Sequence, residues 1–181
     1  MKNKKGFSLI ELLVVVLIIG ILTAITLPQY QLAKDKAEFM KYQSMVASLR
    51  DAYDEYVLIH GEGPANFDKL SISLPNDFTR VHGNATSGIQ CFQNSQMFCC
   101  MSRSGENYAA LINCGKNDLS VMYTQSIFTK SNTPTRLRRC MAKENHARAN
   151  RLCSSLGNKG GTSNGWTPEG PTSNYRNYTL N

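Results

Sequence analysis

Charge is almost absent from residues 7–27, where Glu11 is the only charged side chain. An apolar run of this length can cross roughly 30 Å of hydrocarbon as an α-helix. No later run is as long or as apolar, so we expect one transmembrane helix at residues 7–28. The rest of the chain has room for one globular domain of modest size.

Acidic side chains are scarce at the other end, since Glu144 and Glu169 are the only ones in the last fifty residues. A calcium loop, which needs several carboxylates, is therefore not expected there. No CxxC pair or phosphate-binding loop occurs, and the three histidines are scattered, so we expect no metal, no cofactor and no catalytic residue. The chain is not expected to be an enzyme.

The net charge of +7 arises mainly from residues 130–181, which carry nine basic residues. A solvated face or a subunit contact is the simpler interpretation of this cluster. The alternative is a patch that binds DNA or another anionic surface. The residues concerned are Arg136, Arg138, Arg139, Lys143, Arg148 and Arg151.

Cysteine is absent before residue 91, so all six cysteines follow the apolar run. Outside the cytoplasm they can form disulfides, and six cysteines allow fifteen pairings, among which the sequence does not choose. A helix expected at residues 141–156 would hold Cys140 and Cys153 about 20 Å apart, too far to bond to each other. Cys99 and Cys100 should face opposite sides of a strand and have different partners. The candidates are Cys91, Cys99, Cys100, Cys114, Cys140 and Cys153.

The residues around the apolar run distinguish it from an ordinary signal peptide. Lys2, Lys4 and Lys5 precede it and favour a cytoplasmic N-terminus. No small-x-small cleavage site follows it. Glu11 is costly in hydrocarbon, on the order of 2.5–3.5 kcal/mol on insertion scales, and an acid in such a place usually has a partner or a role.

The segment KKGFSLIELLVVVLIIGIL, followed by Pro28, resembles the leader and N-terminal helix of type IV pilins and type II secretion pseudopilins. The resemblance implies that residues 1–6 are a leader, cut between Gly6 and Phe7 by a prepilin peptidase that methylates Phe7. It also implies that Glu11 meets the N-terminal amine of a neighbouring subunit and sets the register of assembly. Gly20 and Pro28 are expected to loosen or kink the helix, although both residue types are common in membrane helices.

From this resemblance we expect a structural subunit of a type IV pilus, polymerising through its N-terminal helix. The alternatives are a minor pilin or a pseudopilin, and, in another class, a monomeric membrane-anchored receptor or enzyme. The implied partners are copies of itself, related pilins, the peptidase and an inner-membrane assembly platform. The expected location is a single pass through the inner membrane, followed by an extracellular pilus or a periplasmic filament.

The remaining sequence predicts an α+β fold with a long N-terminal helix packed on a small antiparallel sheet. Residues 29–60 form an amphipathic stem with apolar side chains at helical spacing. The head, residues 61–181, begins with a connecting region to about residue 88. It continues with strands at 89–93, 97–103, 108–113 and 119–129, and then a basic connection at 134–139. The tail from Gly160 is expected to attach through Trp166, Tyr175 and Tyr178.

Overall fold

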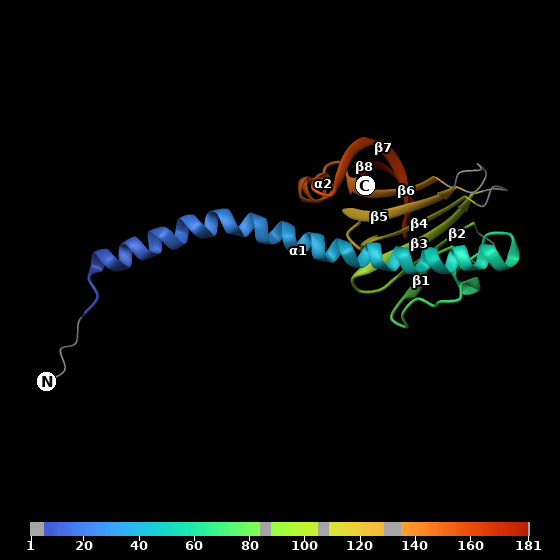
Figure 1. Cartoon of the computed structure of the whole chain (residues 1–181), viewed down its shortest axis with the longest axis horizontal. Coiled ribbons are helices and arrows are strands. Elements are labelled where there is room, and N and C mark those ends of the chain that lie inside the picture. Colours follow the sequence, from blue (N-terminus) through green and yellow to red (C-terminus); the bar gives the residue numbers. More distant parts are fainter. Residues whose placement is uncertain (1–5, 84–87, 105–108, 129–134, 181) are drawn as a thin grey trace. The chain divides into compact units, whose positions relative to one another are not determined.

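The computed structural model describes residues 6–83, 88–104, 109–128 and 135–180. The chain divides into two compact units, Met1–Ala37 and Glu38–Asn181. One helix, α1 (Leu9–His60), contributes to both units (Figure 1). The other elements lie in the second unit: η1 (Phe67–Lys69), β1 (Thr79–His82), β2 (Ile89–Gln93), β3 (Met97–Ser104), β4 (Ala109–Lys116), β5 (Val121–Phe128), β6 (Thr135–Lys143), α2 (Ala147–Ser154), β7 (Gly157–Thr167) and β8 (Gly170–Leu180).

Over the described residues the strands form one eight-stranded sheet in the order β1-β2-β3-β4-β5-β6-β8-β7. Every neighbouring pair is antiparallel. The first six strands follow chain order because short turns join them, which is the meander that the turn residues predict. The predicted α+β class, with a long apolar N-terminal helix and an antiparallel sheet, is confirmed.

The second half of α1 covers one face of this sheet. Its buried side chains recur at helical spacing, and the ring of Phe39 meets that of Tyr123 on β5 edge to face at 5.8 Å. Tyr56 continues the predicted stripe, but it is only half-buried and stacks on His60 at 4.0 Å. The buried members of the stripe are Phe39, Tyr42, Val46, Leu49, Ala52 and Tyr53.

The opposite face of the sheet has its own core, which the C-terminal tail helps to close. Tyr175 of β8 is 2% exposed there, and its hydroxyl donates a hydrogen bond to the carbonyl of Leu119 at 2.5 Å. Tyr178, three positions from Tyr175 along the β6 register and so on the other face of the sheet, donates to the side chain of Asn150 on α2 at 3.0 Å. The tail is therefore a pair of long strands rather than a surface loop. This second core comprises Cys91, Phe98, Cys100, Met122, Met141 and Tyr175.

Several predicted boundaries differ from the structure. The strand at 89–93 has the predicted bounds, and β3, β4 and β5 lie close to theirs, with Tyr108 and Thr129 outside the described residues. β1 lies within the stretch predicted as a connection. The basic connection at 134–139 and the helix at 141–156 are wrong, because β6 runs through Lys143 and only Ala147–Ser154 is helical.

The six cysteines, all within the described residues, form three disulfides. Cys91 pairs with Cys100, and Cys99 pairs with Cys114. Each bond joins residues directly opposite each other on neighbouring strands, with Cα atoms 4.1 Å apart. Because Cys99 and Cys100 are adjacent on β3, the two bonds lie on opposite faces of the sheet. The expectation that these two cysteines have different partners is confirmed.

The third disulfide corrects the sequence analysis, because Cys140 and Cys153 are bonded to each other. Their Cα atoms are 5.4 Å apart, not the 20 Å that a continuous helix would impose. Cys140 lies within β6, the chain turns at residues 144–146, and α2 then leads back to place Cys153 over the strand. The predicted helix began too early, because residues 141–143 belong to β6 and α2 begins only at Ala147.

We predict that replacing Cys140 and Cys153 with serine lowers the free energy of unfolding by about 3 kcal/mol, because the bond closes a loop of this size in the unfolded chain. Denaturant unfolding of the full chain in detergent, followed by circular dichroism, measures the change. Ser95→Ala, at an exposed turn, serves as the control. An unchanged unfolding midpoint would contradict a stabilising role for this bond.

Two buried tyrosines make the stability of the head fall at alkaline pH. Desolvation by burial raises the pKa of Tyr53 to about 12, although the positive charge of Arg103 opposes the rise. Burial also raises the pKa of Tyr123, against the charges of Arg138 and Arg50. The unfolded tyrosines ionise near pH 10 and the folded ones only at higher pH. Their burial therefore stabilises the fold fully below about pH 10, and this contribution is lost as pH rises towards 12.

We predict that the unfolding free energy falls between pH 10 and pH 12 and that Tyr53→Phe makes this fall shallower by on the order of 2 kcal/mol. Unfolding curves measured across this pH range provide the test. Tyr30→Phe, which alters an exposed ring, should keep the wild-type slope. Identical slopes for Tyr53→Phe and wild type would refute the prediction.

Candidate functional site

The helix α1 begins immediately after the predicted cleavage site. Gly6, Phe7 and Ser8 are non-helical, and Leu9 is the first helical residue. The Ser8 amide donates to Oε2 of Glu11 at 2.8 Å, and the Ser8 carbonyl accepts from the Glu11 amide at 3.1 Å. This is the carboxylate half of a capping box, in which an acid at the third helical position satisfies the amide that precedes the helix. Within a single chain, Glu11 therefore already has a hydrogen-bond donor.

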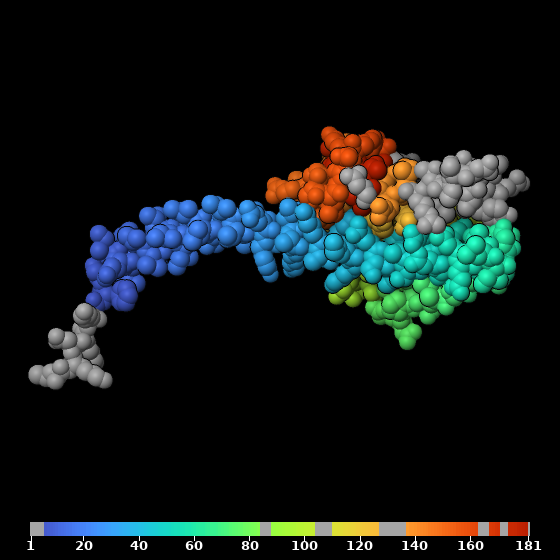
Figure 2. All heavy atoms as spheres, viewed as in Figure 1, coloured from blue at the N-terminus to red at the C-terminus, as the bar shows by residue number. Residues whose placement is uncertain are grey.

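The apolar segment that follows is uncovered on every side. The most apolar window of α1 has none of its residues buried, and Leu9 is 87% exposed. Figure 2 shows the atoms of this segment in blue. By length and composition this is a helix that could cross a membrane. An uncovered apolar surface of this size indicates contact with lipid or with other protein.

Polar atoms within this segment are satisfied by the helix itself. The hydroxyls of Thr23 and Thr26 donate to the carbonyls of Ile19 and Leu22 at 2.7 and 3.0 Å. Such back-bonding lets threonine sit at membrane depth without an unpaired donor. The helix runs unbroken through Gly20 and Pro28. Pro28 has no N–H to offer the carbonyl one turn earlier, which weakens the helix at that point. The kink or unwinding expected there stays a prediction.

The predicted basic cluster does not form one surface. Arg138 and Arg139 are successive on β6 and so project to opposite faces of the sheet, with Arg138 exposed and Arg139 half-buried. Lys143, Arg148 and Arg151 are exposed at the end of β6 and on α2. The side chains of Arg136 and Trp166 lie outside the described residues, as do the leader lysines before Gly6.

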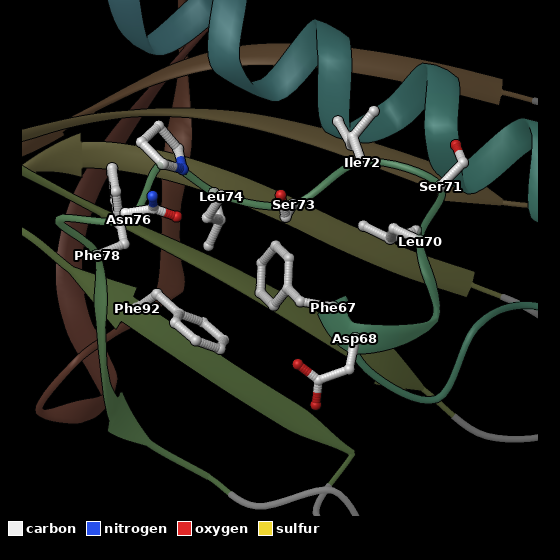
Figure 3. A pocket seen from close by; sticks show the side chains of 11 residues that line it. Phe67, Asp68, Leu70, Ser71, Ile72, Ser73, Leu74, Asn76, Phe78 and Phe92 are labelled. Carbon is white, nitrogen blue, oxygen red and sulfur yellow. The ribbon is translucent and has the colours of Figure 1, made fainter.

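A surface pocket of about 470 Å³ lies beside η1 and the loop that follows it (Figure 3). Its floor is apolar, with the rings of Phe67 and Phe92 edge to face at 5.3 Å. The guanidinium of Arg80 lies 5.5 Å from the Phe92 ring centre and pairs with Asp68 at 3.3 Å. The Asp68 carboxylate at the rim of the pocket is therefore already neutralised by Arg80. In the described part of the chain, no three His, Cys, Asp or Glu side chains are grouped as metal ligands.

Two helix-capping interactions were not predicted from the sequence. Ser8 was not identified as the N-cap partner of Glu11, although the S-x-x-E spacing of a capping box is visible in the sequence. His146 caps α2, its Nδ1 accepting the Ala149 amide at 3.1 Å. Histidine is an unusual N-cap residue, so no simple pattern would have found it.

We predict that Glu11→Ala increases the hydrogen-exchange rate of the Ser8 amide about fivefold, because losing a cap interaction costs about 1 kcal/mol. Amide exchange measured by NMR on the full chain in detergent micelles tests this. Glu11→Gln keeps an acceptor oxygen and should lie closer to wild type. Equal exchange in Glu11→Ala and wild type would show that the carboxylate does not hold this amide.

The start of the chain matches a known motif. Residues 1–27 match the family model described as the prokaryotic N-terminal methylation motif. A type IV major pilin protein, PilE1, of Neisseria gonorrhoeae is 32% identical over 104 residues, covering 58% of this chain and 56% of that protein. A fimbrial protein of Pseudomonas aeruginosa is 47% identical over 97 residues, covering 52% and 63% respectively. A fimbrial protein of Neisseria meningitidis is 38% identical over 74 residues, covering 41% and 44%.

The chain thus spans about half the length of the curated relatives it matches. No solved structure matches it significantly. The motif and the relatives belong to a family of structural subunits rather than enzymes. The leader motif, and the long helix followed by an antiparallel sheet, accompany sequence similarity to type IV pilins over about half of this chain.

Proposed function

We propose that the chain is a structural subunit of a type IV pilus that polymerises through its N-terminal helix after the leader is removed. The observation that carries the proposal is one carboxylate, Glu11, near the start of α1, within a segment (residues 9–27) that is otherwise apolar and uncovered. A membrane anchor alone requires the apolar side chains. It does not require an acid next to a cleavage motif.

Processing comes first in the proposed sequence of events. A prepilin peptidase cuts between Gly6 and Phe7 and methylates the new N-terminus at Phe7. The support is the methylation motif over residues 1–27 and the non-helical backbone of residues 6–8. The subunit then crosses the inner membrane once, with its N-terminus in the cytoplasm and Glu38–Asn181 outside. The three disulfides are compatible with an oxidising compartment on that side.

Assembly exchanges lipid for protein around the apolar helix. Lipid and neighbouring helices are similarly apolar, so extraction is tolerable only if other copies cover residues 9–27 at once. Gly20 and Ala24 give a small-xxx-small surface that permits close helix approach. An inner-membrane platform and its ATPases supply the work, because the sequence contains no phosphate-binding loop.

Glu11 has two alternative partners in this scheme. In the single chain its carboxylate accepts the Ser8 amide. In the filament it accepts the charged N-terminal amine of a neighbour, a stronger, charge-assisted hydrogen bond. A slip of one turn would leave a buried carboxylate and a buried amine unpaired, each at a cost of several kcal/mol. The ion pair therefore fixes the register between neighbouring subunits.

We predict that Glu11→Val inserts into the membrane as wild type does but gives no surface filaments. Membrane fractionation measures insertion, and electron microscopy with mass spectrometry of sheared fibres measures assembly and locates the mature N-terminus. Leu13→Val, a conservative change in the same segment, is the control. Normal filaments from Glu11→Val would refute the proposal in favour of a simple membrane anchor. A minor share of this chain in sheared fibres would identify a minor subunit.

A further inference from the structure

The helix α2 is capped by a side chain that can take up a proton. His146 has the extended backbone of an N-cap residue, with φ −105° and ψ 93°. Its Nδ1 atom accepts a hydrogen bond from the Ala149 amide at 3.1 Å. A ring nitrogen that accepts carries no proton, so the neutral ring must hold its proton on Nε2. The cap therefore depends on the protonation state of the imidazole.

The usual N-cap residues do not have this dependence near neutral pH. Serine, threonine, asparagine and ionised aspartate can accept the same amide throughout the range from about pH 5 to about pH 8. Histidine is the side chain whose charge ordinarily changes within that range. When the ring takes up its second proton, both nitrogens become donors and Nδ1 no longer accepts. The new positive charge is also unfavourable at the positive end of the helix dipole.

The Ala149 amide has no ready replacement for this acceptor. An amide in the first turn of a helix has no partner within the helix itself. Ala149 is 4% exposed, so water is a poor substitute for the lost nitrogen. Leaving a buried N–H without an acceptor costs more than an exposed hydrogen bond contributes. Protonation of His146 therefore weakens the start of α2.

The rest of α2 is held independently of the imidazole. The side-chain amide of Asn150 donates to the carbonyls of Lys143 and Glu144 at 2.9 and 3.1 Å, and its oxygen accepts the Tyr178 hydroxyl at 3.0 Å. The disulfide between Cys153 and Cys140 fixes the other end of the helix on β6. Loss of the cap should thus loosen the first turn and leave α2 on the sheet.

The charges around α2 affect the pH at which His146 takes up its proton, but not the consequence. No neighbouring charge can turn a protonated Nδ1 into an acceptor. Glu144 is the acidic residue of the turn before α2, and it pairs with Arg176 at 3.3 Å. The charged and titratable groups on α2, on this turn and on the strands that α2 contacts are Lys143 of β6, Glu144, Arg148 and Arg151 of α2, Lys159 of β7, and Arg176 and Tyr178 of β8.

We propose that His146 is a pH-sensitive lock on the start of α2. The neutral imidazole holds the Ala149 amide, and protonation releases it. The stabilisation is present above about pH 6.5, where a histidine is ordinarily neutral, and is lost as pH falls below that value. His146 is exposed, so the surrounding solution reaches the ring directly.

His60 offers a contrast within the same chain. Its Nδ1 lies 3.0 Å from the Tyr56 carbonyl oxygen at the end of α1. A carbonyl oxygen only accepts, so this Nδ1 carries a proton in the neutral ring and in the charged ring alike. Acid therefore leaves the His60 hydrogen bond intact, and the neutral forms of the two rings are different tautomers.

The test is NMR of the full chain in detergent micelles, which reports the tautomer of each imidazole and the protection of each amide against hydrogen exchange. Neutral His146 should carry its proton on Nε2, and neutral His60 should carry it on Nδ1. The protection factor of the Ala149 amide should fall about fivefold between about pH 7.5 and about pH 5, which is the scale of a lost N-cap interaction.

His146→Asn is the matched control, because asparagine is a good N-cap residue and does not titrate. In this variant the Ala149 amide should be equally protected at both pH values, whereas in His146→Ala its protection should be low at both. The inference is overturned by an unchanged protection factor in wild type or by an equal fall in His146→Asn. A neutral His146 that carries its proton on Nδ1 would also overturn it.

Discussion

The apolar side chains of residues 9–27 must be covered by something other than their own chain, and the rest of the molecule follows from that constraint. None of the residues in the most apolar window of α1 is buried. In the assembly that we propose, lipid covers them first and other copies of the same helix cover them afterwards. In that proposed assembly Glu11 makes the exchange specific, because a carboxylate can be buried only opposite a donor. Ser8 supplies that donor in the single chain.

The head keeps its surfaces at fixed positions relative to one another. Disulfides on both faces of β3 join the first strands, and the bond between Cys140 and Cys153 holds α2 on β6. The helix α1 fills one face of the sheet, while the β7–β8 pair closes the other through Tyr175. A small domain with limited core gains stability from such covalent links.

Local patterns predicted more of the helix and the early strands than of the C-terminal third. The 3.6-residue stripe from Phe39 to Tyr53 is confirmed, because apolar spacing on a helix reports directly which face is buried. The four strands between residues 89 and 128 are bounded by turn residues and were also predicted. β6 was missed because its alternating pattern is obscured by four basic residues. The tail, rich in Gly, Ser, Thr and Asn, has weak strand propensity. Its pairing depends on the cores that Tyr175 and Tyr178 reach.

The sequence by itself determined the apolar span, the methylation motif, the place of Glu11 and the amphipathic stem, because each depends on residues close together in the chain. It also determined that Cys99 and Cys100 must have different partners. Only the tertiary structure decided that Cys140 bonds to Cys153 and that Arg138 and Arg139 face apart. These outcomes depend on strand register and on where the chain reverses at residues 144–146. Both are set by packing between segments far apart in sequence.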